Sequence, residues 1–284
     1  MHKLTIVLRW LVLMPFISPP FLWYYAFHIE PNWIQVTRIE ILSPLFNERL
    51  EKIKMVQISD LHIHKQGVRE ERLINIINKI QPDVIFITGD IIGDKNSWPV
   101  CLRVLSQLKA NKGIFAILGD TEDYLIKYNK AVSDLRKIGI TVLNHDNLRV
   151  KFNNGAVLWI AGISERYAAL ARYGKPEYID DTFKGIPDNV PVLLLIHKPE
   201  LAEHKKIAKY APSLILAGDT HGGQFGIPFI RKMSDYANHS KYMGGLFLVN
   251  GIPLYVNRGI GTIRINMRFL CRPEITKIIL KKRE

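Results

Sequence analysis

Residues 53–64 read IKMVQISDLHIH, an apolar run that stops at Asp60 and is followed at once by His62 and His64. The same order, a short apolar run and then an aspartate or histidine, returns at FITGD (86–90), AILGD (116–120), LLLIH (193–197) and LILAGDTHGG (214–223). Short apolar runs of this length are typical of strands buried on both faces. We therefore expect five strand ends to converge on one site.

The composition indicates a globular protein with an anionic partner. The chain has 284 residues, 48% of them hydrophobic, and a formal net charge of +13. Such a charge favours phosphate esters, an acidic membrane surface or nucleic acid. No RRM, KH, zinc-finger or helix-turn-helix signature is present, so no nucleic-acid partner is expected. Cys101 and Cys271 lack CxxC spacing and indicate neither a disulfide framework nor a thiolate metal site.

The amino terminus has the composition of a membrane anchor. Residues 4–27 are almost entirely apolar or aromatic, which is roughly the ~20 residues that a spanning helix needs. No A-x-A cleavage site follows, so we expect a retained anchor at 1–30. Pro15, Pro19 and Pro20 leave open a re-entrant or interfacial segment, or an apolar arm packed on the domain. Positive residues flank both ends, so charge does not select the side of the membrane.

The rest of the chain, residues 36–284, is predicted to form one domain with two sheets. Apolar periodicity predicts strands at 36–42, 53–59, 84–88 and 113–118 and helices at 68–80, 100–108 and 124–138. This alternation is typical of parallel βαβ units. Later residues predict a hairpin at 148–161, an irregular polar stretch at 167–184, and strands at 192–196, 214–217, 245–250, 254–257 and 275–280.

Seven oxygen and imidazole side chains stand at the expected strand ends: Asp60, His62, Asp90, Asp120, His197, Asp219 and His221. A single Gly-Asp usually marks a turn, and a single histidine usually has a structural role. Here five strand-like runs each end in such a residue, and this repetition favours a shared site over separate structural roles. Carboxylates and imidazoles suit divalent first-row metals and two-metal sites.

The order of these residues resembles that of the calcineurin-like metallophosphoesterases, from about residue 54 to the end. Asp60 and His62 match the family's D-x-H, Gly89-Asp90 its G-D, His197 its single histidine, and 218–221 its G-H-x-H. The resemblance implies a two-sheet α/β sandwich with flanking helices, preceded here by an N-terminal apolar helix. Residues 218–224 and 254–261 and the stretch RPEITKIIL resemble a membrane-associated bacterial branch, which includes a UDP-2,3-diacylglucosamine pyrophosphatase of lipid A biosynthesis.

The resemblance also implies roles for the candidate residues. Asp60, His62 and His221 would bind one metal ion, with Asp90 as the bridge. The second ion would take Asp120, His197 and Asp219. We assign Asp90 and Asp120 to catalysis as well, together with Arg258 as a contact for the substrate phosphate.

Three side chains depart from the family pattern. Residues 119–122 read GDTE where the family has G-N-H-[DE], and Asp219 replaces the first histidine of G-H-x-H. Two divalent metal ions are expected at the site. The added carboxylates favour manganese for them, with magnesium, iron and zinc as alternatives. Thr121 replaces a histidine, and a threonine cannot carry a proton or a positive charge at neutral pH. A diphosphate substrate would depend less on that lost acid.

These features predict a metal-dependent hydrolase of a phosphate ester or pyrophosphate bond. The expected substrate is phosphorylated and membrane-associated or lipid-linked, such as UDP-2,3-diacylglucosamine. The expected location is the bacterial inner membrane, with the membrane surface as a partner. The alternative is a family member that has lost catalysis and binds metal or phospholipid at the membrane, which the changes at Asp120, Thr121 and Asp219 motivate.

Overall fold

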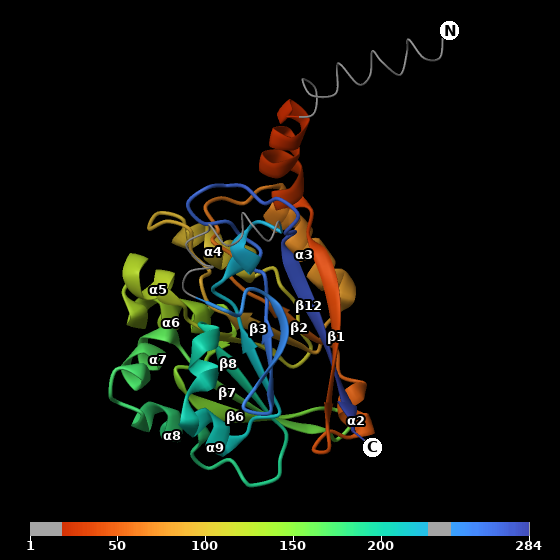
Figure 1. Cartoon of the computed structure of the whole chain (residues 1–284), viewed down its shortest axis with the longest axis vertical. Helices are drawn as coiled ribbons and strands as arrows, with labels where there is room; N and C mark the ends of the chain where they lie inside the picture. The colour runs from red at the N-terminus through yellow and green to blue at the C-terminus, as the bar shows by residue number, and fades with distance from the viewer. Residues whose placement is uncertain (1–18, 227–239, 284) are drawn as a thin grey trace.

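Two six-stranded sheets lie face to face, with helices on their outer sides (Figure 1). The computed structural model describes residues 19–226 and 240–283. The first sheet has the order β1 (Gln35–Ser43), β12 (Glu274–Lys282), β2 (Met55–Ile58), β3 (Val84–Thr88), β4 (Gly113–Ile117), β5 (Ile140–Val142). The second has the order β10 (Gly245–Val249), β11 (Ile252–Val256), β9 (Leu214–Ala217), β8 (Val192–Ile196), β7 (Val157–Ile163), β6 (His145–Lys151). The predicted two-sheet α/β sandwich is confirmed.

Strand registry places the candidate residues at one edge. Strands β2, β3, β4 and β5 are parallel neighbours in the first sheet, and β7, β8 and β9 are parallel neighbours in the second. The carboxyl ends of parallel strands meet at the same edge of a sheet. Because the two sheets are stacked, their edges supply one common site.

The continuous apolar runs are explained by burial on both faces. Phe86 of β3 and Leu193 of β8 lie in the core between the sheets. Ile85 contributes to a second core beneath α3 (Val68–Ile80), α4 (Trp98–Leu105) and α6 (Tyr128–Lys137), and Leu194 to a third beneath α7 (Glu165–Arg172), α8 (Glu177–Phe183) and α9 (Lys205–Tyr210). Nearly every residue of these strands is therefore apolar, and the exception in β3 is its last residue, Thr88.

Some predicted elements were wrong in detail. The stretch 167–184, expected to be irregular, contains most of α7 and all of α8, whose buried side chains include the small Ala168 and Ala171. The helix expected at 124–138 is split into α5 (Asp120–Leu125) and α6, because Ile126 and Lys127 are extended. The short helix α2 (Glu48–Glu51) and strand β5 were not predicted.

The N-terminal segment packs against the loop that precedes β12. Residues 19–24 are helical, followed by the π-turn η1 (Tyr25–Ile29) and the 3₁₀ turn η2 (Glu30–Asn32). The buried Glu30 carboxylate accepts the backbone N–H groups of Leu270 and Cys271, at 2.8 and 2.5 Å. This part of the segment is therefore fixed to the domain.

The predicted anchor at 1–30 lies mainly outside the described residues, which begin at 19. Within 19–226 and 240–283, no helix combines the length and apolarity required to cross a bilayer. The division into an anchor and a domain at 36–284 stays a prediction.

Candidate metal centre

Sharp turns after the strands aim the candidate side chains inward. Asp60 after β2, Asp90 after β3 and Asp219 after β9 all have positive φ angles, of 49°, 52° and 70°. His62 and His221 share this left-handed conformation, with φ of 38° and 51°. Residues other than glycine rarely adopt it, and where they do the strain is usually held in place by a functional site. Five strained positions at one edge of the fold mark this as such a site.

Backbone hydrogen bonds hold the turns together. The N–H of Asp60 donates to Gly89 O at 3.0 Å, and the N–H of His62 donates to Asp90 O at 3.0 Å. The N–H of Gly218 donates to His197 O, also at 3.0 Å. The loops after β2 and β3, and those after β8 and β9, are therefore fixed to each other.

Two glycines are required by close packing against the aspartates. A Cβ at Gly119 would lie 2.2 Å from Asp90 Oδ1, and a Cβ at Gly218 would lie 2.4 Å from Asp60 Oδ2. Neither distance leaves room for a methyl group. The glycine of each of these Gly-Asp motifs therefore leaves space for a carboxylate from another strand.

Five buried side chains form two overlapping groups that could each hold a metal ion. The first consists of Asp60, His62 and His221, and the second of Asp60, Asp90 and His197, with ligand atoms within 4.8 Å of one another in each group. His62 Nε2 lies 3.1 Å from His221 Nε2, and His197 Nε2 lies 3.4 Å from Asp90 Oδ1. Imidazole and carboxylate donors are those that divalent first-row metals take.

The orientation of His197 tests the fit to a metal. Its Nδ1 lies 2.8 Å from Thr88 O, and because a carbonyl can only accept, Nδ1 carries the proton. In the neutral imidazole, the form that binds a metal, Nε2 then has its lone pair directed at Asp90 and Asp219, and within the described residues this buried atom has no hydrogen-bond partner. A buried polar atom without a partner is costly, and a metal ion would satisfy it. The residues present therefore fit a metal ion.

Burial and neighbouring charges oppose each other in this cluster. Burial raises the pKa of Asp60 to about 8. Burial also acts to raise the pKa of Asp90, but the charges of His197 and His62 outweigh it and hold that pKa well below its usual range. Burial lowers the pKa of His62 and of His221. For His197 the attraction of Asp90 outweighs burial, so its pKa is raised. Such opposing pressures on buried groups are common at functional sites.

Of the aspartates predicted to bind the second ion, Asp219 lies at the cluster and Asp120 lies outside it. Asp219 Oδ1 is 3.6 Å from His197 Nε2, and the Asp219 N–H donates to both Asp60 oxygens, at 3.1 and 3.0 Å. Asp120 is exposed, and its Oδ2 pairs with Lys198 Nζ at 2.5 Å. The structure thus brings Asp219 to the cluster and leaves Asp120 outside both three-residue groups.

The predicted phosphate contact and the threonine substitution are both engaged in hydrogen bonds. Arg258 Nε donates to Glu274 Oε2 at 3.1 Å, so this guanidinium is held by a buried carboxylate. The backbone N–H and the hydroxyl of Thr121 both donate to Asp90 Oδ1, each at 3.1 Å. Thr121 therefore orients the carboxylate expected to bridge the metals.

Two residues that support the site, Glu122 and Arg268, were not among the site residues predicted from the sequence. The buried Glu122 accepts N–H groups from Gly119, Asp90, Ile91 and Ile92, at 2.8, 3.2, 2.6 and 3.2 Å. Its position in the family motif G-N-H-[DE] was the available signal. The fully buried Arg268 lies outside that motif, so the sequence offered none.

Arg268 joins the loop before β12 to the metal centre. Its guanidinium donates to the carbonyl oxygens of Arg258, Gly261 and Cys271, at 2.8, 2.6 and 3.1 Å. The same group lies 3.5 Å from His221 Nδ1. A buried arginine satisfied by carbonyl groups keeps its charge beside the site.

Comparison with known proteins decides the family. The sequence profile of the calcineurin-like phosphoesterases matches residues 53–223, which contain all seven predicted metal ligands. The chain belongs to the calcineurin-like phosphoesterases. An uncharacterized metallophosphoesterase of Bacillus subtilis, YkuE, is 31% identical over 264 residues, covering 90% of this chain and 89% of the relative.

Two other relatives have more specific names, one for its place in a membrane and one for its substrate. The transmembrane protein with metallophosphoesterase domain of Danio rerio is 28% identical, covering 87% of this chain and 57% of the relative. The UDP-2,3-diacylglucosamine pyrophosphatase LpxG of Chlamydia trachomatis is 25% identical, covering 91% of this chain and 92% of the relative. Membership of this family and the cluster of possible metal ligands both support a metal-dependent hydrolase of phosphoesters.

Proposed function

We propose that the protein hydrolyses a phosphate ester or pyrophosphate bond in a lipid-linked substrate such as UDP-2,3-diacylglucosamine. The observation that carries the proposal is the buried cluster around His197, whose Nε2 lone pair and neighbouring carboxylates fit a divalent ion. The relative LpxG, which covers nearly the whole chain, supports the substrate class. The net charge of +13 suits an anionic substrate at an anionic surface.

In this proposal two divalent ions, with manganese favoured, are held by the clustered side chains. Asp60, His62 and His221 would hold one ion, His197 and Asp219 would hold the other, and Asp90 would contribute its carboxylate to both. Such ions lower the pKa of bound water and stabilise charge on a phosphoryl oxygen. Asp120 would contribute a ligand only if its carboxylate gave up its ion pair with Lys198.

The chain's own residues orient the reacting groups. Thr121 fixes Asp90 through two hydrogen bonds to one oxygen, as described above, but it cannot protonate a leaving group. The leaving group of a diphosphate substrate is itself a phosphate, which is a weak base and needs little protonation. In this proposal Lys198, which directly follows His197, supplies a positive charge near the leaving group. Arg258 reaches the substrate only if it gives up part of its contact with Glu274.

The proposed location is the bacterial inner membrane, with residues 1–30 as the anchor. The described part of that segment exposes apolar and aromatic side chains, with Phe21, Trp23 and Tyr24 at 59, 56 and 53% exposure. Aromatic side chains of this kind favour the interface between water and lipid. The membrane-related relatives support the same placement.

Turnover by the purified full-length protein tests the proposed activity. With manganese, it should hydrolyse bis(p-nitrophenyl) phosphate and, in detergent micelles, UDP-2,3-diacylglucosamine. Asp90→Ala should abolish both reactions, since the Asp90 carboxylate lies 3.5 Å from His62 Nε2 and 3.4 Å from His197 Nε2, one histidine from each group of ligands. Turnover that persists in Asp90→Ala, or a wild-type protein inert with every divalent metal, contradicts the proposal.

A second function is favoured by one observation. Asp120, which stands where the family has an asparagine ligand, pairs with Lys198 outside the cluster. A family member that has lost catalysis and binds metal or phospholipid at the membrane would tolerate this change. The triple variant Asp120→Asn, Thr121→His, Asp219→His distinguishes the two: strong new activity from an inert parent supports the loss of catalysis.

A further inference from the structure

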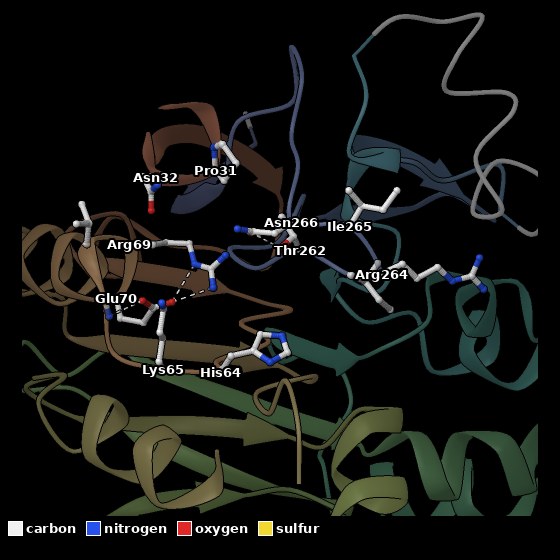
Figure 2. Close-up of a pocket in the computed structure, with 13 residues that line it drawn as sticks. Pro31, Asn32, His64, Lys65, Arg69, Glu70, Thr262, Arg264, Ile265 and Asn266 are labelled. Carbon is white, nitrogen blue, oxygen red and sulfur yellow. Dashed lines mark hydrogen bonds and ion pairs between the residues drawn. The ribbon is translucent and has the colours of Figure 1, made fainter. Parts of the chain in front are cut away.

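A cavity of about 770 Å³ lies beside the metal centre, in a region that the proposed catalytic residues do not use. Its walls come from three segments far apart in the sequence: the N-terminal segment, the loop leading into α3, and the loop before β12. Figure 2 shows Pro31 and Asn32 on one side, Lys65, Arg69 and Glu70 on another, and the loop at 262–266 between them.

One wall of the cavity continues directly from the metal centre. The N–H of Gly261 donates to Asp60 O at 2.7 Å, and a Cβ at Gly261 would lie 2.8 Å from His62 Cβ. The next residue, Thr262, lines the cavity. A substrate bound at the metals could therefore extend into this cavity.

The charge of the cavity suits an anion. Lys65 and Arg69 line it, and its one carboxylate, Glu70, is already engaged. Glu70 Oε2 accepts the Gly67 N–H at 2.9 Å, and Oε1 accepts from Arg69 Nε at 2.9 Å (Figure 2). The guanidinium and the lysine ammonium leave an excess of positive charge, which phosphate oxygens would satisfy.

The rim of the cavity is apolar and faces the N-terminal segment. Val68 and Ile265 line the cavity with 55 and 53% of their surface exposed. Arg72 Nη1 donates to Asn32 O at 2.6 Å and so fixes the N-terminal wall to α3. Upstream of this wall, the segment carries the exposed Phe21 and Trp23. Exposed apolar groups beside a basic cavity suit a charged headgroup with attached acyl chains.

We propose that this cavity binds the acylated, phosphorylated part of a lipid-linked substrate, with Lys65 and Arg69 facing its anionic group and Val68 and Ile265 contacting its acyl chains. The N-terminal segment then forms part of the substrate site, in addition to any role as an anchor. This assignment rests on the proposed function, because it supplies the binding site for the part of the substrate that is not attacked.

Binding measured without turnover separates the cavity from the catalytic centre. Full-length protein in detergent micelles with EDTA is titrated with UDP-2,3-diacylglucosamine and, separately, with UDP-N-acetylglucosamine, which lacks the acyl chains. Lys65→Glu should raise the dissociation constant of the lipid about tenfold, as expected for loss of one charged hydrogen bond. Lys52→Glu makes the same charge change at an exposed residue directly after α2 that does not line the cavity, and it should leave binding unchanged.

A second pair of variants tests the apolar rim. Ile265→Asp should weaken binding of the lipid about tenfold or more, since it places a charge against the acyl chains. Leu248→Asp alters a residue of β10 that is 74% exposed and does not line the cavity, and it should have no such effect. Wild-type protein should bind the compound without acyl chains at least about tenfold more weakly than the lipid.

The outcomes separate this assignment from the proposed activity. Lipid binding that is unchanged in both Lys65→Glu and Ile265→Asp overturns the cavity assignment, whatever the enzyme turns over. Equal affinity for UDP-2,3-diacylglucosamine and UDP-N-acetylglucosamine overturns the proposed contact with acyl chains. The cavity would then be assigned to a soluble nucleotide. With manganese, the control variants Lys52→Glu and Leu248→Asp should hydrolyse bis(p-nitrophenyl) phosphate within about twofold of wild type, because neither residue lines the cavity. A protein that binds the lipid in this way and hydrolyses nothing refutes the activity alone.

Discussion

Lys198 Nζ lies 2.5 Å from Asp120 Oδ2 and 3.5 Å from Glu165 Oε1, immediately after the predicted ligand His197. The charges of Glu165 and Asp120 outweigh burial and raise the pKa of Lys198 to about 12, so it remains charged. An ammonium group therefore stands at the second half of the metal centre, where the family histidine is replaced by Thr121. We expect this charge to compensate in part for that loss.

Replacing Lys198 should therefore slow the reaction. Lys198→Gln removes the charge and should lower kcat for bis(p-nitrophenyl) phosphate by about 10²-fold, the usual loss for one electrostatic stabiliser of a transition state. Lys198→Arg keeps the charge and should stay within about tenfold of wild type. Lys206 offers a matched control, because it also pairs with an aspartate, Asp180, away from the site. Equal losses in Lys206→Gln and Lys198→Gln would show a general effect on folding.

Asp90 should determine metal content as well as turnover. Asp90→Asn removes a carboxylate that lies 3.4 Å from His197 Nε2 and 3.5 Å from His62 Nε2. We expect the manganese bound per chain, measured by mass spectrometry after desalting, to fall to one ion or none. Asp94→Asn is the control, because Asp94 also contacts a histidine, His64, but on the surface. Full metal content in Asp90→Asn would remove Asp90 from the ligand set.

Metal affinity should rise with pH. Burial raises the pKa of Asp60 from 3.8 to about 8, so the metal-free folded protein retains a proton that the unfolded chain loses. The contribution of Asp60 to stability is thus present below pH 3.8 and is lost as the pH rises through 8. Manganese must displace that proton, so its apparent dissociation constant should fall by up to about tenfold per pH unit between roughly pH 6 and 8. Calorimetry in buffers of different ionisation enthalpy would detect the released proton, and pH-independent affinity would contradict the assignment.

The strands and the ligands at their ends were predictable because each is encoded locally. A strand buried on both faces has to be mostly apolar, and β3, β8 and β9 were predicted with the bounds that the structure has. The polar residue that ends such a strand must lie at the edge of the sheet. Asp60, Asp90 and His197 therefore meet, as their sequence positions indicated.

Side-chain orientation was not predictable, because it depends on partners distant in the sequence. Asp120 turns toward Lys198, and Arg258 toward Glu274, and neither pairing has a local signal. Helix α7 was missed for a different reason. Its buried face uses Ala168 and Ala171, which give little hydrophobic periodicity.

The buried carboxylate of Glu122 should determine the stability of the metal centre. Glu122→Ala would leave the N–H groups of Gly119, Asp90, Ile91 and Ile92 without their acceptor. Because each unsatisfied buried donor costs roughly 1–3 kcal/mol, we expect a loss of at least about 3 kcal/mol in the free energy of unfolding. Urea denaturation of the metal-free protein measures it directly. Glu71→Ala, on the exposed face of α3, should change the value by less than about 0.5 kcal/mol. Equal effects of the two variants would mean that water replaces the carboxylate of Glu122.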